Sequence, residues 1–130
     1  MEKFKTIGAI IAIIGALTVV LGAFGAHTLS DKLTESQLAV FKTGVLYQFI
    51  HVIASLIVIV IAVQIDKSSF IYVLYFFIAG MILFSGSLYL LSCKEILGLG
   101  SFSKVLGPIT PLGGLSFIIG WIILAIKLLR

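Results

Sequence analysis

The stretch TGVLYQFIHVIASLIVIVIAVQ, residues 43–64, decides the fold of this chain. It contains no Asp, Glu, Lys or Arg along its whole length. An α-helix rises 1.5 Å per residue, so about 20 residues cross the ~30 Å hydrocarbon core of a bilayer. We therefore predict that this stretch is a membrane-spanning helix.

Three further apolar runs of similar length surround it, at residues 6–26, 69–92 and 111–128, and only Lys127 interrupts them with a charge. The chain of 130 residues is 61% hydrophobic and 11% charged, whereas soluble domains are about 25% charged. Its mean hydropathy is +1.29. In lipid only helices and closed barrels satisfy the backbone, and these runs lack the alternation of barrel strands. The predicted fold class is all-α: a polytopic membrane protein, one domain over residues 1–130, with four transmembrane helices in a compact antiparallel bundle.

The segments between the runs predict where the helices begin. The first run exceeds the 7–15 apolar residues of a signal peptide, so we expect a retained membrane helix. Thr34 with Gln37 forms a capping box, which predicts that the second helix begins at Glu35. Thr110 before Pro111 predicts the start of the fourth helix. The apolar, glycine-containing segment 93–110 is expected to lie at the membrane interface or to be partly re-entrant.

Small residues recur along the first and fourth helices. Gly8, Gly15 and Gly22 are each followed by alanine. A similar row of small residues lies in the last apolar run: Gly113, Ser116 and Gly120. Small residues let helix backbones approach closely in lipid. We expect these rows to pack helices and, because they exceed what one bundle needs, to support a homo-oligomer.

Polar side chains form one stripe on the second helix. At 100° per residue, Tyr47, Gln48, His51 and Ser55 fall within an arc of about 100°. Ser85 and Tyr89 share a face of the third helix in the same way. Polar groups in a membrane turn toward the bundle interior. We predict that His51 is neutral, buried and hydrogen-bonded to a neighbouring helix or to an ordered water, and the hydroxyls of Ser85 and Tyr89 are the expected partners. Three roles stay open for the stripe: a packing cluster, a binding or relay site, and catalysis.

Several function classes lack support in the sequence. No acidic residue in the apolar runs could orient His51 as a base, and scattered serines are the only nucleophiles there, so we expect no enzyme. His27 lies near the membrane surface while His51 lies deeper, so no metal site is predicted. His27 is expected to be an interfacial or loop-capping residue, with a functional role left open. No cofactor is predicted, Cys93 has no disulfide partner, and the scattered lysines give no reason to expect nucleic acid.

Four ordered motifs carry a resemblance over nearly the whole chain: LGAFGAHTL (21–29), FKTGVLYQFIH (41–51), FSGSLYLL (84–91) and ITPLGGLSFIIGW (109–121). Together they resemble the YwdK/YgdD family of small bacterial membrane proteins, a domain of unknown function (423) related to transmembrane protein 256. The resemblance implies four helices in the bacterial inner membrane and supplies no reaction. It maps the polar positions of the family to His27, Tyr47, Gln48, His51, Ser85, Ser87, Tyr89, Thr110 and the pair Gly113-Gly114.

Two functional hypotheses follow. In the first, the protein is a structural or accessory bundle that binds membrane lipids or a membrane-protein partner. In the alternative, it forms a pocket or pathway for a small polar solute at an oligomer interface. Five of the nine basic residues lie on the membrane side that holds both termini, and four lie on the other side. Under the positive-inside rule this count predicts cytoplasmic termini.

Overall fold

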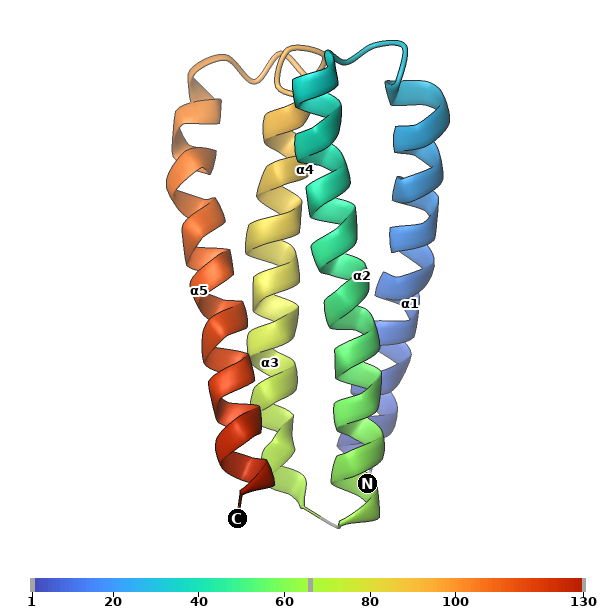
Figure 1. The fold of residues 1–130 in the computed structure, drawn as a ribbon, viewed down its shortest axis with the longest axis vertical. Coiled ribbons are helices and arrows are strands. Elements are labelled where there is room, and N and C mark those ends of the chain that lie inside the picture. The colour runs from blue at the N-terminus through green and yellow to red at the C-terminus, as the bar shows by residue number, and fades with distance from the viewer. Residues whose placement is uncertain (1, 66, 130) are drawn as a thin grey trace.

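The computed structural model describes residues 2–65 and 67–129, which form a bundle of long antiparallel helices (Figure 1). Four segments of this described chain are long and apolar enough to cross a membrane, which confirms the predicted fold class. The first span, Glu2–Leu29, consists of α1 (Glu2–Phe24) and the π-helical turn η1 (Gly25–Leu29). The second span is α2 (Glu35–Gln64).

The third span, Ser68–Ser92, is a rod made of several helical elements in succession. These are the 3-10 turn η2 (Ser68–Phe70), α3 (Ile71–Gly80), the π-helical turn η3 (Met81–Ser85) and α4 (Gly86–Ser92). The fourth span consists of η4 (Gly100–Phe102) and α5 (Ser103–Leu128).

The two ends of the bundle differ in what they carry. In Figure 1, α1 begins and α5 ends at the end that also holds the connection between α2 and α3. We call this the termini end. The connections between α1 and α2 and between α4 and α5 lie at the opposite end, which we call the loop end (Figure 1).

The capping box predicted for α2 is present. The hydroxyl of Thr34 accepts a hydrogen bond from the backbone N–H of Gln37 at 3.2 Å. The side-chain oxygen of Gln37 accepts in turn from the backbone N–H of Thr34 at 3.0 Å. Since the first backbone N–H groups of a helix have no partner within it, this pair fixes the start at Glu35, as predicted.

The predicted start of the fourth helix is wrong. The helix α5 begins at Ser103, so Pro108 and Pro111 both lie inside it and Thr110 caps nothing. The hydroxyl of Thr110 instead lies 3.4 Å from the carbonyl oxygen of Leu106, one turn back. Membrane helices tolerate proline when hydroxyl side chains and neighbouring helices satisfy the freed backbone groups. The expected interfacial segment 93–110 is therefore shorter, because its second half is helical.

The apolar core fills mainly the half of the bundle nearest the termini end. Its buried side chains come from the beginning of α1, the later part of α2, the third span and the later part of α5: Phe4, Ile7, Ile11, Val52, Ala54, Val58, Ala62, Phe70, Val73, Leu74, Phe77, Met81, Phe117 and Leu124. The first span packs mainly on α2, and α5 packs on the third span. Toward the loop end this arrangement leaves room between α1 and α4.

The glycines of α5 lie in its contact with the third span. A Cβ at Gly113 would overlap the backbone nitrogen of Phe84, and one at Gly120 would stand 2.7 Å from the ring of Phe77. Between them, the hydroxyl of Ser116 donates a hydrogen bond to the carbonyl of Phe76 at 2.8 Å. Glycine therefore allows α5 to approach the third span at distances that no side chain would permit.

Gly8, Gly15 and Gly22 of the first span face α2, and the contact at Gly15 is the tightest of the three. Cβ atoms built at Gly8, Gly15 and Gly22 would meet the side chains of Ile59, Val52 and Val45 at 3.6, 3.1 and 3.5 Å, respectively. These glycines therefore belong to a contact within the chain. The alanines that follow them, Ala9, Ala16 and Ala23, are exposed on the outer side of α1.

Candidate functional site

Gln48 joins three helices by hydrogen bonds inside the bundle. The side chain is only 5% exposed. Its Nε2 donates to the hydroxyl of Thr18 on α1 at 2.8 Å, and its Oε1 accepts from the hydroxyl of Tyr89 on α4 at 2.7 Å. The Thr18 hydroxyl donates onward to the carbonyl of Ile14 at 2.7 Å. A buried amide needs such partners, so this chain of bonds fixes the register of α1, α2 and α4.

The ring of Tyr89 fits against a glycine of α2. A Cβ at Gly44 would stand 2.8 Å from the Tyr89 ring, and the ring of Phe41 lies beyond it at a centroid distance of 4.9 Å. Gly44 thus makes the space in which the Tyr89 hydroxyl reaches Gln48.

His51 is bonded to α5 rather than to the third span. It is 3% exposed, and its Nε2 accepts a hydrogen bond from the indole Nε1 of Trp121 at 3.1 Å. Its Nδ1 lies 2.7 Å from the backbone carbonyl of Tyr47. The imidazole also stacks on Phe117, with ring centroids 3.5 Å apart and planes within 10°.

These two contacts fix the protonation state of His51. An indole N–H only donates and a carbonyl only accepts. Nε2 must therefore carry a lone pair and Nδ1 must carry the proton, which is the neutral imidazole in its Nδ1–H tautomer.

The predicted partners of His51 were wrong. Tyr89 bonds Gln48, and the buried hydroxyl of Ser85 has no hydrogen-bond partner within the described residues. The shared polar faces predicted that these side chains turn inward, but they did not predict the direction of the imidazole ring. Stacking on Phe117 and the indole donor of Trp121 turn the ring toward α5.

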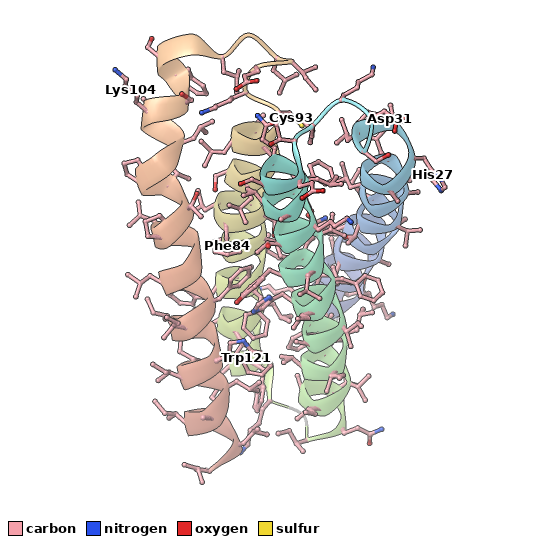
Figure 2. All side chains as sticks on the ribbon, turned by 45° about the horizontal axis from the view of Figure 1, so that its top comes forward. His27, Asp31, Phe84, Cys93, Lys104 and Trp121 are labelled. Carbon is pink, nitrogen blue, oxygen red and sulfur yellow. The ribbon has the colours of Figure 1, made fainter. Side chains whose placement is uncertain are left out.

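The remaining predicted polar residues take different positions. Ser55 and Ser85 are fully buried, and their hydroxyl oxygens have no hydrogen-bond partner within the described ranges 2–65 and 67–129. Tyr47 lies at the edge of the bundle, 40% exposed, with its ring on Phe84 at a centroid distance of 4.7 Å. His27 is exposed in η1 and points away from the bundle in Figure 2, so it does not join the stripe.

Two partners in the cluster were missed from the sequence. Thr18 lies between Gly15 and Gly22 on the small-residue face of α1, and a hydroxyl in such a row is a signal that could have found it. Trp121 is the single tryptophan, and its N–H needs an acceptor where the indole packs inside a bundle. A further contact joins two positions that the resemblance singled out, since the hydroxyls of Ser87 and Thr110 lie 2.6 Å apart between α4 and α5.

An apolar groove runs between α1 and the third span. Its inner part has a volume of about 250 Å³, with Ile14, Leu17 and Leu21 on one wall and with Met81, Ile82 and Gly86 on the other. Gln48 and Tyr89 form its floor. The polar atoms on that floor bond each other, so the groove offers an apolar surface.

The groove continues toward the loop end. This outer part has a volume of about 270 Å³ and shares Leu21 and Tyr89 with the inner part. It ends among the residues of the two loops, including Lys32 and Cys93. We call the inner and outer parts together the α1–α4 groove.

The side chains that commonly bind metal ions do not gather within the part of the chain that the structure describes. No group of three His, Cys, Asp or Glu among residues 2–65 and 67–129 could hold a metal ion. The one buried imidazole uses both nitrogens in internal contacts. The arrangement joins the helices by internal hydrogen bonds and leaves an apolar groove between α1 and the third span.

Comparisons with known proteins agree with the resemblance seen in the motifs. Residues 21–114 match the family described as a protein of unknown function (DUF423). The UPF0382 membrane protein YwdK of Bacillus subtilis is 41% identical, covering 100% of this chain and 98% of its own. The UPF0382 inner membrane protein YgdD of Escherichia coli is 38% identical, covering 92% and 86%. No solved structure matches the chain. The chain therefore belongs to this family of membrane proteins of unknown function, DUF423 or UPF0382.

Proposed function

We propose that this protein is an accessory membrane protein that binds a lipid acyl chain in the α1–α4 groove and catalyses no reaction. One observation carries the proposal: the groove is lined by aliphatic side chains, while the polar atoms on its floor already bond each other. An occupant that needs hydrogen bonds would find no free partner there. A hydrocarbon chain needs none, and in the groove it exchanges contacts with other lipid chains for van der Waals contacts with aliphatic side chains.

The location of the groove favours a lipid over a soluble ligand. It lies along spans that are apolar enough to cross a membrane. Lipid acyl chains are the most abundant apolar molecules at that depth. The alternative of a pathway for a polar solute has less support, because Gln48 and His51 use their polar atoms within the bundle.

The setting that we propose is the bacterial plasma membrane, with both termini in the cytoplasm. Two relatives are named membrane proteins, one of them of the inner membrane. A homo-oligomer or a membrane-protein partner would use the outer side of α1, where Ala9, Ala16 and Ala23 leave a row of small exposed residues.

Gly86 provides the test of lipid binding. It lines the groove, and a Cβ built there meets no atom within 4 Å. Gly86→Leu would place a bulky side chain at the wall of the groove, starting from a Cβ in open space, and loss of glycine favours the helix by up to about 1 kcal/mol. Gly107→Leu is the matched control, because Gly107 is also helical and open but lies outside the groove.

We would extract each full-length variant in mild detergent, add mixed phosphatidylcholine and phosphatidylglycerol, and record native mass spectra. Wild type and Gly107→Leu are expected to retain one lipid, and Gly86→Leu to lose it while keeping its thermal stability. Equal lipid retention by all three proteins would contradict the proposal.

A further inference from the structure

We propose that the α1–α4 groove selects a phospholipid with an anionic headgroup, whose phosphate lies beside Lys32 at the loop end. This inference rests on the proposed lipid binding and adds the class of lipid. Among the described residues that line the two parts of the groove, Lys32 is the one that carries a charge.

The groove has a direction that matches a phospholipid. Its inner part lies deep in the bundle beside Gln48, and its outer part reaches the loops that follow η1 and α4. A lipid has the same order, with the hydrocarbon inside and the headgroup at the membrane surface. An acyl chain between Ile14 and Met81 would therefore bring its headgroup toward Lys32.

Backbone hydrogen bonds hold the loop around Lys32 at this end of the groove. The N–H of Lys32 bonds the carbonyl of Leu29 at 3.0 Å, and the N–H of Leu33 bonds the same carbonyl at 2.9 Å. Leu29 is buried and itself lines the groove. The loop is thus anchored to the outer part of the groove, while the flexible lysine stem lets the charge follow a phosphate.

Charge complementarity separates the possible headgroups. A lysine near the membrane surface attracts anionic lipid by an amount that corresponds to roughly fivefold in affinity. Phosphatidylcholine is neutral overall because its choline cation offsets the phosphate, whereas phosphatidylglycerol keeps a net negative charge. Asp31 and Glu95 belong to the same loops, but neither lines the groove.

The experiment compares two lipids with identical acyl chains. Full-length protein in mild detergent is mixed with equimolar phosphatidylglycerol and phosphatidylcholine, and the bound lipids are counted by native mass spectrometry. Wild type is expected to prefer phosphatidylglycerol about fivefold. Lys32→Gln should bring the ratio near one without loss of total bound lipid. Lys104→Gln is the control, because Lys104 is also near the loop end but lines neither part of the groove (Figure 2).

Each outcome has a distinct meaning. Equal binding of both lipids by wild type, with loss in Gly86→Leu, would overturn the headgroup inference and leave the proposed function intact. If the preference for phosphatidylglycerol fell equally in Lys32→Gln and Lys104→Gln, its cause would be the general surface charge of the protein, and this too would overturn the inference. If Gly86→Leu left lipid binding unchanged, the proposed function and the headgroup inference would both be overturned. The same would follow if Gly86→Leu dissociated a dimer, because the groove would then be a contact between two copies.

The single cysteine gives an independent measure of location. Cys93 lines the outer part of the groove, close to the proposed headgroup position. Phosphatidylglycerol is expected to slow the reaction of Cys93 with N-ethylmaleimide more than phosphatidylcholine does, and Lys32→Gln to remove the difference. Equal rates in the two lipids for wild type would contradict the inference.

Discussion

Trp121 of α5 donates its indole N–H to Nε2 of His51 on α2 across 3.1 Å, and this bond joins two helices that otherwise meet through aromatic rings. The donor occupies the ring nitrogen that a catalytic or metal-binding histidine would need to keep free. His51 therefore holds α5 in place, and its neighbour Phe117 packs flat against the imidazole.

Trp121→Phe tests this bond, since it removes the N–H and keeps an aromatic ring beside Phe77. We expect a loss of about 1 kcal/mol in the free energy of unfolding, typical of hydrogen bonds between membrane helices. Unfolding in mixed detergent micelles measures it. His51→Leu should cost a similar amount, and adding Trp121→Phe to that variant should cost much less. Additive losses would show that the two residues do not interact.

The tautomer of His51 is tested separately. In ¹⁵N NMR spectra the proton of His51 is expected on Nδ1, so a proton on Nε2 would contradict the assigned tautomer.

Gln48→Leu is expected to destabilise the bundle more than Tyr89→Phe or Thr18→Val does, because Gln48 bonds both of these residues. It leaves the Tyr89 hydroxyl without its acceptor and removes the Thr18 contact, at a cost of about 1–3 kcal/mol. Tyr89→Phe removes one bond and leaves the Gln48 oxygen unpaired, and Thr18→Val removes the other. The free energies of unfolding of the three variants decide the point. A Gln48→Leu loss no larger than that of Tyr89→Phe would mean that the Thr18 bond contributes nothing.

The sequence predicted the bundle because apolar length and charge depletion are properties of each helix by itself. Burial of Gln48, His51 and Ser55 also follows from the pattern of one face of α2, and burial of Ser85 from one face of the third span. The pairing between helices does not, because it depends on which way each ring turns and how closely the backbones approach. Trp121 was overlooked for this reason: its role exists only because Gly113 and Gly120 bring α5 close to the third span. The helical start at Ser103 was missed because the prolines after it usually mark a boundary in water.

Orientation in the membrane is the third prediction. The positive-inside rule favours cytoplasmic termini by a narrow count of basic residues. The termini end has five, Lys3, Lys5, Lys67, Lys127 and Arg130, and the loop end has four, Lys32, Lys42, Lys94 and Lys104. Arg130 lies outside the described residues. We would replace Cys93 by serine and introduce a cysteine at Ser101, which is exposed in η4 at the loop end. A membrane-impermeant maleimide is expected to label Ser101→Cys in intact cells. Labelling only after lysis would place the termini outside.

Self-association is tested by two neighbouring residues on opposite sides of α1. Gly15 faces Val52 within the chain, whereas Ala16 is exposed. Gly15→Leu should therefore destabilise the bundle itself, by about 1–3 kcal/mol from overpacking. Ala16→Leu should leave the fold intact and, if the outer side of α1 joins two copies, lower the mass measured by light scattering in detergent. A mass unchanged by Ala16→Leu would exclude this side of α1 as the contact.

The close approach of α5 to the third span yields a prediction from two adjacent glycines. A Cβ at Gly113 would overlap the backbone nitrogen of Phe84, which cannot move without shifting the third span, whereas a Cβ at Gly114 would meet only the edge of the Phe84 ring at 3.8 Å. Gly113→Ala is therefore expected to cost about 1–3 kcal/mol or more in the free energy of unfolding. Gly114→Ala should be neutral or stabilise the helix by up to about 1 kcal/mol. Because Ser116, Phe117 and Trp121 follow on the same helix, Gly113→Ala should also disturb the indole bond to His51, visible as a change in Trp121 fluorescence. Equal stability of the two alanine variants would show that α5 does not approach the third span this closely.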